Sequence, residues 1–437
     1  MTEKTIERQD AGMRFHGIVT DKFKMSRLSF NFILPADKNK SPLTKLMLAV
    51  MMRGSAKYPT VTAINRRLDE LYGATVTWRA TRIGERHIFR ISCEMLGEKY
   101  RLPDDECNIS MGVCDVILDI LLNPLKDGNG LLSSANIESE KKLAIDALKA
   151  RINDQKAYAS AQCQKLMLGD DPAGISIEGS EKQIAAFTPE ELTENIAYFL
   201  KNSVLECYYV GNDDFTGLAK AVGDAFAPLK RENLVLCGEE KAFVSKNADC
   251  IRSAEETMSV SQGRLNIGLT CGVIMSDENY YSMSLFNEMF GGSSVSKLFM
   301  NVREKQSLCY YCYSSYHSAT GIIMIGCGIK PENRDKAFAE IENQLREMQS
   351  GRFSEEDIIT AKRTVISGLR QISDSPSAIE AYKFRGFLAG VDETAEETIE
   401  RLNAVGKDSI IAAAQRVRID TVYFLSGNGE EEEWDDE

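Results

Sequence analysis

Arg303 and Tyr310 stand seven residues apart (310 − 303), at the boundary between a predicted helix and a predicted strand. Apolar residues recur at helical spacing over 295–302, and aromatic residues dominate 308–316. A guanidinium and a phenol at such a junction can hold a peptide carbonyl or carboxylate by directed hydrogen bonds. A structural role is also open, in which Arg303 caps the helix C-terminus and Tyr310 packs. These two residues are therefore candidates for substrate binding.

The composition is that of an ordinary globular protein with room for two hydrophobic cores. Of the 437 residues, 43% are apolar and 27% are charged. The formal net charge of -13 disfavours nucleic acid or an anionic membrane surface as the main partner. Part of that charge lies in the acidic residues of 430–437, which we expect to form a solvated tail.

Cysteine usage and the lack of long apolar runs predict a cytoplasmic protein. The N-terminus contains no apolar segment typical of a secretory signal, and the longest apolar runs are too short to span a bilayer. The eleven cysteines are scattered and odd in number, which is typical of a reducing compartment. Cys309 and Cys312 alone have C-x-x-C spacing, but they fall within a predicted strand, so we expect no redox or zinc role for them.

The order of predicted elements in the first half of the chain recurs in the second half. A strand, helices, a hairpin and further helices follow one another, including one long helix over 136–167. Local sequence repeats as well: LSFNFIL from Leu28 is echoed by LNIGLTC from Leu265, and Gly54 by Gly291, both at an offset of 237 residues (265 − 28 and 291 − 54). A constant offset of this kind indicates an internal duplication.

We therefore predict an α+β fold of two homologous domains, each a largely antiparallel sheet with helices packed on one face. The N-terminal domain is predicted over 1–230. A polar segment without helical periodicity, 231–249, is the predicted linker. The C-terminal domain is predicted over 250–437 and includes the acidic tail.

Several stretches resemble the pitrilysin/insulinase-type zinc peptidases, especially the two-domain bacterial members akin to mitochondrial processing peptidase. They are RGSAKYP from Arg53, LDELYGA from Leu68, GDDPAGISIEGS from Gly169 and FGGSSVSKLFMNVREKQSLCYYCYS from Phe290. The resemblance implies a chain that forms half of a clamshell around a central chamber. It also implies that Arg303 and Tyr310 bind the substrate backbone there.

The sequence departs from that family at the zinc motif. Active members carry H-x-x-E-H on the helix that reads SPLTKLMLAVMMRGS in this chain, and the matching positions hold Lys45, Leu48 and Ala49. A catalytic zinc needs three protein ligands and an open water position. An amine, an isobutyl group and a methyl group do not supply them. We therefore expect an inactive homologue with no metal and no other cofactor.

The remaining candidate ligands do not restore a metal site. The three histidines, His16, His87 and His317, are not at ligand spacing from one another, and we expect packed or surface roles for the two in strands, His87 and His317. Glu138 and Glu140 lie where the family keeps its downstream glutamate, and without histidines we expect them on a solvated face.

Two functions remain open, neither of which makes this chain an enzyme on its own. In the first, it is the non-catalytic subunit of a heterodimer, shaping the chamber and binding peptide for an active zinc-bearing partner, because substrate positioning and zinc chemistry are separable tasks. In the second, it is a peptide-binding or scaffold homodimer. Similar bacterial tandem pairs include some associated with elongation factor P modification. An autonomous metallopeptidase would need bound zinc.

Overall fold

The computed structural model describes residues 2–8, 11–231, 240–245, 250–258 and 262–427. The predicted linker, 231–249, lies largely outside the described residues, and the predicted acidic tail lies wholly outside them. Within the described part of the chain, no helix is both long enough and apolar enough to cross a bilayer.

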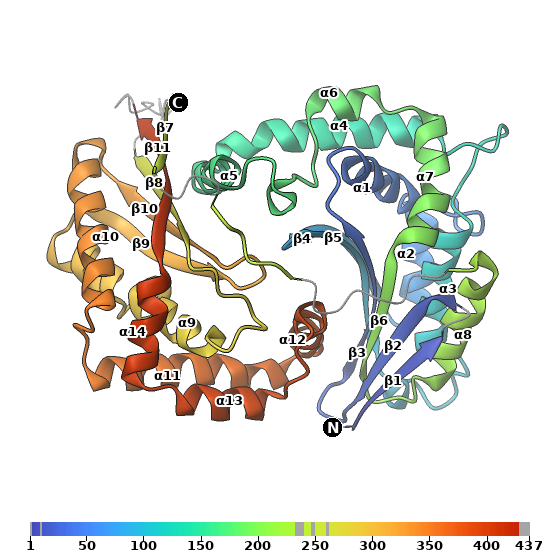
Figure 1. Ribbon diagram of the computed structural model, residues 1–437. Coiled ribbons are helices and arrows are strands. Elements are labelled where there is room, and N and C mark those ends of the chain that lie inside the picture. Colours follow the sequence, from blue (N-terminus) through green and yellow to red (C-terminus); the bar gives the residue numbers. More distant parts are fainter. Residues whose placement is uncertain (1, 9–10, 232–239, 246–249, 259–261, 428–437) are drawn as a thin grey trace, which may run out of the picture. The chain divides into compact units, whose positions relative to one another are not determined.

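The chain forms two compact units, and each unit takes a segment from the opposite half of the sequence (Figure 1). The first consists of Met1–Lys149, Ile175–Cys237 and Ser373–Arg385. The second consists of Ala150–Gly174, Gly238–Ile372 and Gly386–Glu437. The boundaries predicted from the sequence follow the order of the chain and do not include this exchange.

The first unit is built on a six-stranded sheet of order β1-β2-β6-β3-β5-β4. Only β2 and β6 pair in parallel; the other neighbours are antiparallel. The strands are β1 (Thr2–Arg8), β2 (Met13–Val19), β3 (Met25–Pro35), β4 (Thr75–Ile83), β5 (Arg86–Leu96) and β6 (Val204–Gly211).

The second unit is built on a five-stranded sheet of order β7-β11-β8-β10-β9. Again one pair, β7 and β11, is parallel and the rest are antiparallel. The strands are β7 (Arg252–Met258), β8 (Gly263–Thr270), β9 (Cys309–His317), β10 (Ile322–Ile329) and β11 (Arg418–Gly427). Strand for strand, this order matches that of the first sheet without β1, so the predicted pair of largely antiparallel α+β domains is confirmed.

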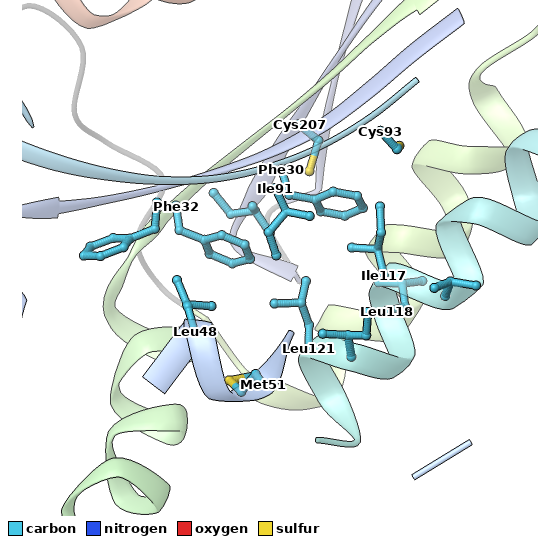
Figure 2. Close-up of a cluster of buried hydrophobic side chains, with 14 of the residues drawn as sticks. Phe30, Phe32, Leu48, Met51, Ile91, Cys93, Ile117, Leu118, Leu121 and Cys207 are labelled. Carbon is cyan, nitrogen blue, oxygen red and sulfur yellow. The ribbon is translucent and has the colours of Figure 1, made fainter. Parts of the chain in front are cut away.

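Helices cover mainly one face of the first sheet (Figure 1). The apolar side chains of β3, among them Phe30 and Phe32, pack against those of the facing helices in one core (Figure 2). Burying each such ring contributes about 1.5–3 kcal/mol. The helices are α1 (Lys40–Met51), α2 (Val61–Glu70), α3 (Ile109–Leu122), α4 (Ser134–Ala150), α6 (Glu181–Ala186), α7 (Pro189–Asn202) and α8 (Thr216–Phe226).

The second sheet has an equivalent core between its strands and its helices. Capping boxes start two of these helices, at Ser354 and Thr394, as their sequences predict. The helices of the chain's second half are α9 (Tyr280–Asn287), α10 (Arg334–Gln349), α11 (Glu355–Gln371), α12 (Pro376–Ala389), α13 (Ala395–Ala404) and α14 (Lys407–Arg416).

The single long helix predicted over 136–167 is wrong, because the chain turns between α4 and α5 (Gln155–Leu168). A 3-10 turn at Arg151–Asn153 separates them, and the Asp154 side chain accepts a hydrogen bond from the Ala157 amide (3.0 Å), which caps α5. The break lies where the chain passes into the second unit. There α5 packs on the sheet face opposite the main core.

The first sheet also has one helix on its opposite face, the N-terminal part of α12. Its Glu380 is 1% exposed and accepts hydrogen bonds from Arg27 Nε and from Ser29 Oγ (2.7 Å). The Arg90 guanidinium lies 3.5 Å from the same carboxylate. Phe384 packs edge-on against Tyr208, with ring centroids 6.0 Å apart. A helix from the second half of the sequence is thus fixed to the first sheet by a buried ionic network.

His87 on β5 is a packed residue, as its strand context predicts, while His317 is exposed. His87 is fully buried, and its Nε2 lies 3.1 Å from the Ile175 carbonyl oxygen, to which it donates. Burial lowers the pKa of His87 to about 4, because a buried imidazolium would lose its hydration.

We expect the first unit to lose stability as the pH falls from about 6.5 towards 4, because the unfolded chain binds a proton at His87 before the folded chain does. The expected loss is about 2–3 kcal/mol. Urea unfolding at stepped pH measures it. His87→Gln keeps a donor near Ile175 and should flatten this dependence, whereas His317→Gln should not. An unchanged pH profile in His87→Gln would contradict the assignment.

Candidate functional site

The helix whose sequence matches the position of the zinc motif is α1. The side chains at its three motif positions are packed in the core, paired with a carboxylate, or half-buried. Leu48 is 1% exposed, and Figure 2 shows it pointing towards the sheet that carries Phe32. Lys45 is paired with the Glu178 carboxylate. Ala49 is half-buried on the same helix. These positions therefore present a packed apolar side chain, a neutralised ammonium and a methyl group.

The downstream glutamates differ from each other. Glu138 is exposed and pairs with Lys141 at 2.9 Å, as expected of a solvated face. Glu140 is mostly buried and pairs with Arg53 at 2.8 Å, so its predicted solvated position is wrong. Arg53 also donates to Ser139 Oγ (2.6 Å). Burial raises the pKa of the Glu140 carboxyl, and the guanidinium of Arg53 opposes that shift.

This environment does not fit zinc. Carboxylates near the motif helix, Glu140 and Glu178, are neutralised by Arg53 and Lys45 rather than held free for a metal. Across the described ranges, no group of three or more His, Cys, Asp or Glu side chains is arranged to hold a metal ion. Zinc needs deprotonated ligands that converge on one point. No hydrolytic step through a metal can be derived from these residues.

Arg303 lies in a π-helical segment, Phe299–Lys305, rather than at the end of the predicted α-helix. Its guanidinium stacks over the Phe299 ring, 4.6 Å from the centroid, and its Nε lies 3.6 Å from the Glu304 carboxylate. Even so, 41% of the side chain remains exposed. The ring therefore fixes the direction of the guanidinium without consuming its hydrogen-bond donors.

Tyr310 follows on β9, the edge strand of the second sheet, and is 48% exposed. Between the two residues, Ser307 has a left-handed backbone (φ 50°). The Ser307 amide donates to the Arg303 carbonyl (2.9 Å) and the Leu308 amide to the Val302 carbonyl (3.1 Å). These bonds close the helical segment and turn the chain into β9. One turn thus carries both predicted binding residues, and each keeps an exposed side chain.

The glycine pair before this segment serves close packing. Gly291 lies in a second π-helical segment, Glu288–Gly292. A Cβ at Gly291 would come within 2.6 Å of the backbone nitrogen of Ser314 on β9. Ser314 Oγ in turn donates to the Asn287 side-chain oxygen (2.8 Å). Only glycine permits this approach, so the Gly-Gly motif sets the distance between the helix and β9.

The pairs Lys45–Glu178 and Arg53–Glu140 were not predicted from the sequence. A signal for them exists, since a cation stands at the first motif position and a second one stands eight residues later (53 − 45). Their acidic partners lie far along the chain, and only the fold brings them together. That Arg303 and Tyr310 together bind the backbone of a peptide substrate stays a prediction.

A family model described as "Peptidase M16 inactive domain" matches residues 186–365 of the chain. A relative from Bacillus subtilis (strain 168), named "Probable inactive metalloprotease YmfF", is 29% identical over 422 residues, which cover 97% of either protein. An "Uncharacterized zinc protease" from Rickettsia felis is 22% identical over 312 residues, covering 70% of this chain and 72% of that protein.

Solved structures share the fold at low sequence identity. A conserved protein from Enterococcus faecalis V583 matches with a TM-score of 0.89 at 24% identity, covering 99% of this chain and 100% of that one. A peptidase M16 inactive domain from Pseudomonas fluorescens matches with a TM-score of 0.78 at 16% identity, covering 98% of both. These likenesses extend over both units of the chain.

We expect Leu48→Glu to lower the free energy of unfolding by about 3 kcal/mol or more, because a carboxylate would replace a side chain packed in the apolar core. The control Leu48→Met keeps the volume and should cost less than about 1.5 kcal/mol. Urea denaturation of both variants measures the difference. If Leu48→Glu is as stable as the control, the position opens to solvent and could accept the family's glutamate after all.

Proposed function

We propose that this chain, a homologue of the M16, or pitrilysin/insulinase-type, peptidases without their zinc motif, is the non-catalytic partner of an active, zinc-bearing family member. In this role it contributes part of the wall of a substrate chamber and binds the peptide. The partner supplies the zinc, its ligands and the glutamate base.

The proposal is carried by a contrast between the two candidate sites. At the motif positions, Lys45 is neutralised by Glu178 and Leu48 is packed in the core, so neither offers a hydrogen-bond donor to a substrate. Arg303 and Tyr310, by comparison, keep exposed donors. Helix capping does not need the guanidinium, because the carbonyls of Val302 and Arg303 already accept backbone amides. The structural alternative for Arg303 is thereby weakened.

An extended peptide offers carbonyl groups that suit these donors. The Arg303 guanidinium presents a planar set of N–H groups, and the Tyr310 hydroxyl adds one O–H. Held this way, a peptide loses translational and rotational freedom before the partner's zinc acts on it. Positioning of that kind lowers the barrier even though this chain performs no chemistry.

A second candidate is a peptide-binding or scaffold homodimer, which the same exposed pair would serve equally well. We attribute the matching strand orders of the two sheets to an internal duplication. We also propose a cytoplasmic location, because ten described cysteines are free thiols, seven of them buried in the cores, as suits a reducing compartment.

We expect Arg303→Ala to weaken the binding of fluorescent, extended peptides of mixed sequence by about tenfold or more, because it removes a charged hydrogen bond. Tyr310→Phe should give a smaller loss, about two- to tenfold. Fluorescence anisotropy measures both. Lys305→Ala removes an exposed cation from the same segment and serves as the matched control. Equal affinities for Arg303→Ala and the wild type would remove this role.

Purification of the tagged chain from its native host separates the two candidates. The heterodimer predicts a stoichiometric partner that carries H-x-x-E-H, and a pair that cleaves peptides and is inhibited by a chelator. Native mass spectrometry reads the composition directly. A homodimer that binds peptides without cutting them would replace the first candidate with the second. Unaided, chelator-sensitive hydrolysis by this chain would contradict both.

A further inference from the structure

Three cysteine side chains converge beneath the turn that carries Arg303 and Tyr310. Cys312 on β9 lies directly opposite Cys327 on β10. The next regular pairs are Tyr311 with Gly328 and then Cys309 with Ile329, so Tyr310 is an extra residue in a β-bulge. Side chains alternate along a strand, and one inserted residue reverses that alternation. Cys309 and Cys312 therefore point to the same face of the sheet, together with Cys327.

The three thiols differ in accessibility. Cys312 and Cys327 are buried in the core of the second unit, whereas Cys309 is half-buried at its margin. The thiols of Cys309, Cys312 and Cys327 shift one another's pKa values, and the positive charge of Arg303 acts on Cys309. Across the described residues these thiols do not make a metal-binding group. Their arrangement suits chemistry between sulfur atoms, with one sulfur open to a small reagent.

The cluster also concentrates negative charge on one sulfur. Hydrogen bonds from the Cys312 and Cys327 thiols, together with the positive charge of Arg303, hold the pKa of Cys309 below the ordinary thiol value. The pKa values of Cys312 and Cys327 are raised, first by their hydrogen bonds to Cys309. A thiolate is the reactive form of cysteine, so oxidation would begin at Cys309.

We propose that Cys309 is an oxidisable thiol that closes a reversible disulfide with one of the two buried thiols beside it, and that this modification regulates peptide binding at Arg303 and Tyr310. The expectation that this C-x-x-C pair has no redox role is thereby revised. Its basis was that the pair falls within a strand. A regular strand would point the two side chains to opposite faces, but the bulge brings them to the same face.

The chemistry balances with hydrogen peroxide as the oxidant. The Cys309 thiolate attacks one peroxide oxygen, the O–O bond breaks, and hydroxide leaves, which gives the Cys309 sulfenic acid. The thiol of Cys312 or Cys327 then attacks that sulfur, the S–O bond breaks, and water leaves as the S–S bond forms. Two thiols are oxidised by two electrons, and one peroxide is reduced to two waters after protonation. A dithiol reductant reverses the reaction by exchange.

The effect on binding rests on the proposed function, whereas the thiol chemistry does not. Disulfide formation removes the Cys309 thiolate, which is an electrostatic partner of Arg303. It also draws Cys309 inward, and Tyr310 is its neighbour in the bulge. Because a disulfide tolerates only a narrow range of Cβ positions, the bulge must adjust. Both predicted binding residues are therefore coupled to the redox state of one sulfur.

The test uses the full-length chain carrying Cys250→Ser, which removes an exposed thiol outside the cluster. Treatment with hydrogen peroxide should remove two hydrogens from the intact mass and create a disulfide that contains Cys309. Trypsin leaves the three cysteines in one peptide, 306–334, because Pro331 blocks cleavage after Lys330, so a second cleavage after the tyrosines is needed to map the bond. A disulfide from Cys309 to either neighbour supports the proposal.

Cys309→Ser should slow disulfide formation at least about tenfold, whereas Cys271→Ser, a buried thiol elsewhere in the second unit, should not change it. A parallel measurement needs no variant: in the wild type, iodoacetamide should label Cys309 at least about tenfold faster than Cys271. Equal labelling rates, or no disulfide at Cys309, would overturn the proposal and leave the proposed function untouched.

Peptide binding supplies the second readout, with the fluorescent peptides used for Arg303→Ala. Oxidation should weaken binding by about fivefold or more, and dithiothreitol should restore it. A Cys309 disulfide that leaves affinity unchanged would overturn the regulatory claim. Failure of the reduced protein to bind peptide, while the disulfide still forms, would overturn the proposed function and support the modification site.

Discussion

A buried carboxylate, Glu380, joins a helix from the second half of the sequence to the sheet of the first half. Arg27, Ser29 and Arg90 surround it with hydrogen bonds and charge. Removing one partner from a buried ion pair costs about 3–5 kcal/mol, because the remaining charge is left without compensation. The first unit therefore depends on residues that lie more than 350 positions from the start of β3, and neither half of the chain contains all of its own fold.

The second unit shows the reciprocal arrangement. The helix α5 comes from the first half of the sequence and packs on the second sheet. A Cβ at Gly268 would meet the Met167 sulfur at 2.6 Å, so the strand backbone approaches α5 closely. Tyr158 on α5 and Tyr423 on β11 both donate to Glu256. Each unit therefore contains a helix from the opposite half of the sequence. Neither half of the chain supplies all the elements of one unit.

The two candidate sites differ in how regular and how exposed they are. At the motif helix, an aliphatic side chain fills the core and cations neutralise the nearby carboxylates, which is a self-sufficient arrangement. At the turn before β9, two π-helical segments, a left-handed serine and a β-bulge depart from regular geometry. Such departures are concentrated at functional sites in proteins, because local strain is retained where it positions a side chain.

Sequence alone determined the features that rest on local spacing and on residue chemistry. Alternating apolar residues predicted β3, β5 and β8, and polar caps predicted the starts of α7, α11 and α13. The identities of Lys45, Leu48 and Ala49 predicted a motif helix without zinc ligands. The edge strands β1 and β7 escaped prediction because their exposed or half-exposed faces carry little apolar alternation. Only the tertiary structure decided where the helix after α4 breaks and that α5 and α12 pack on the opposite units. It also decided the partners of Glu140 and Glu178, and the register that puts Cys309, Cys312 and Cys327 on one face of the sheet. Each of these depends on a contact between residues distant in the chain, or on one residue of strand register, and local patterns contain neither.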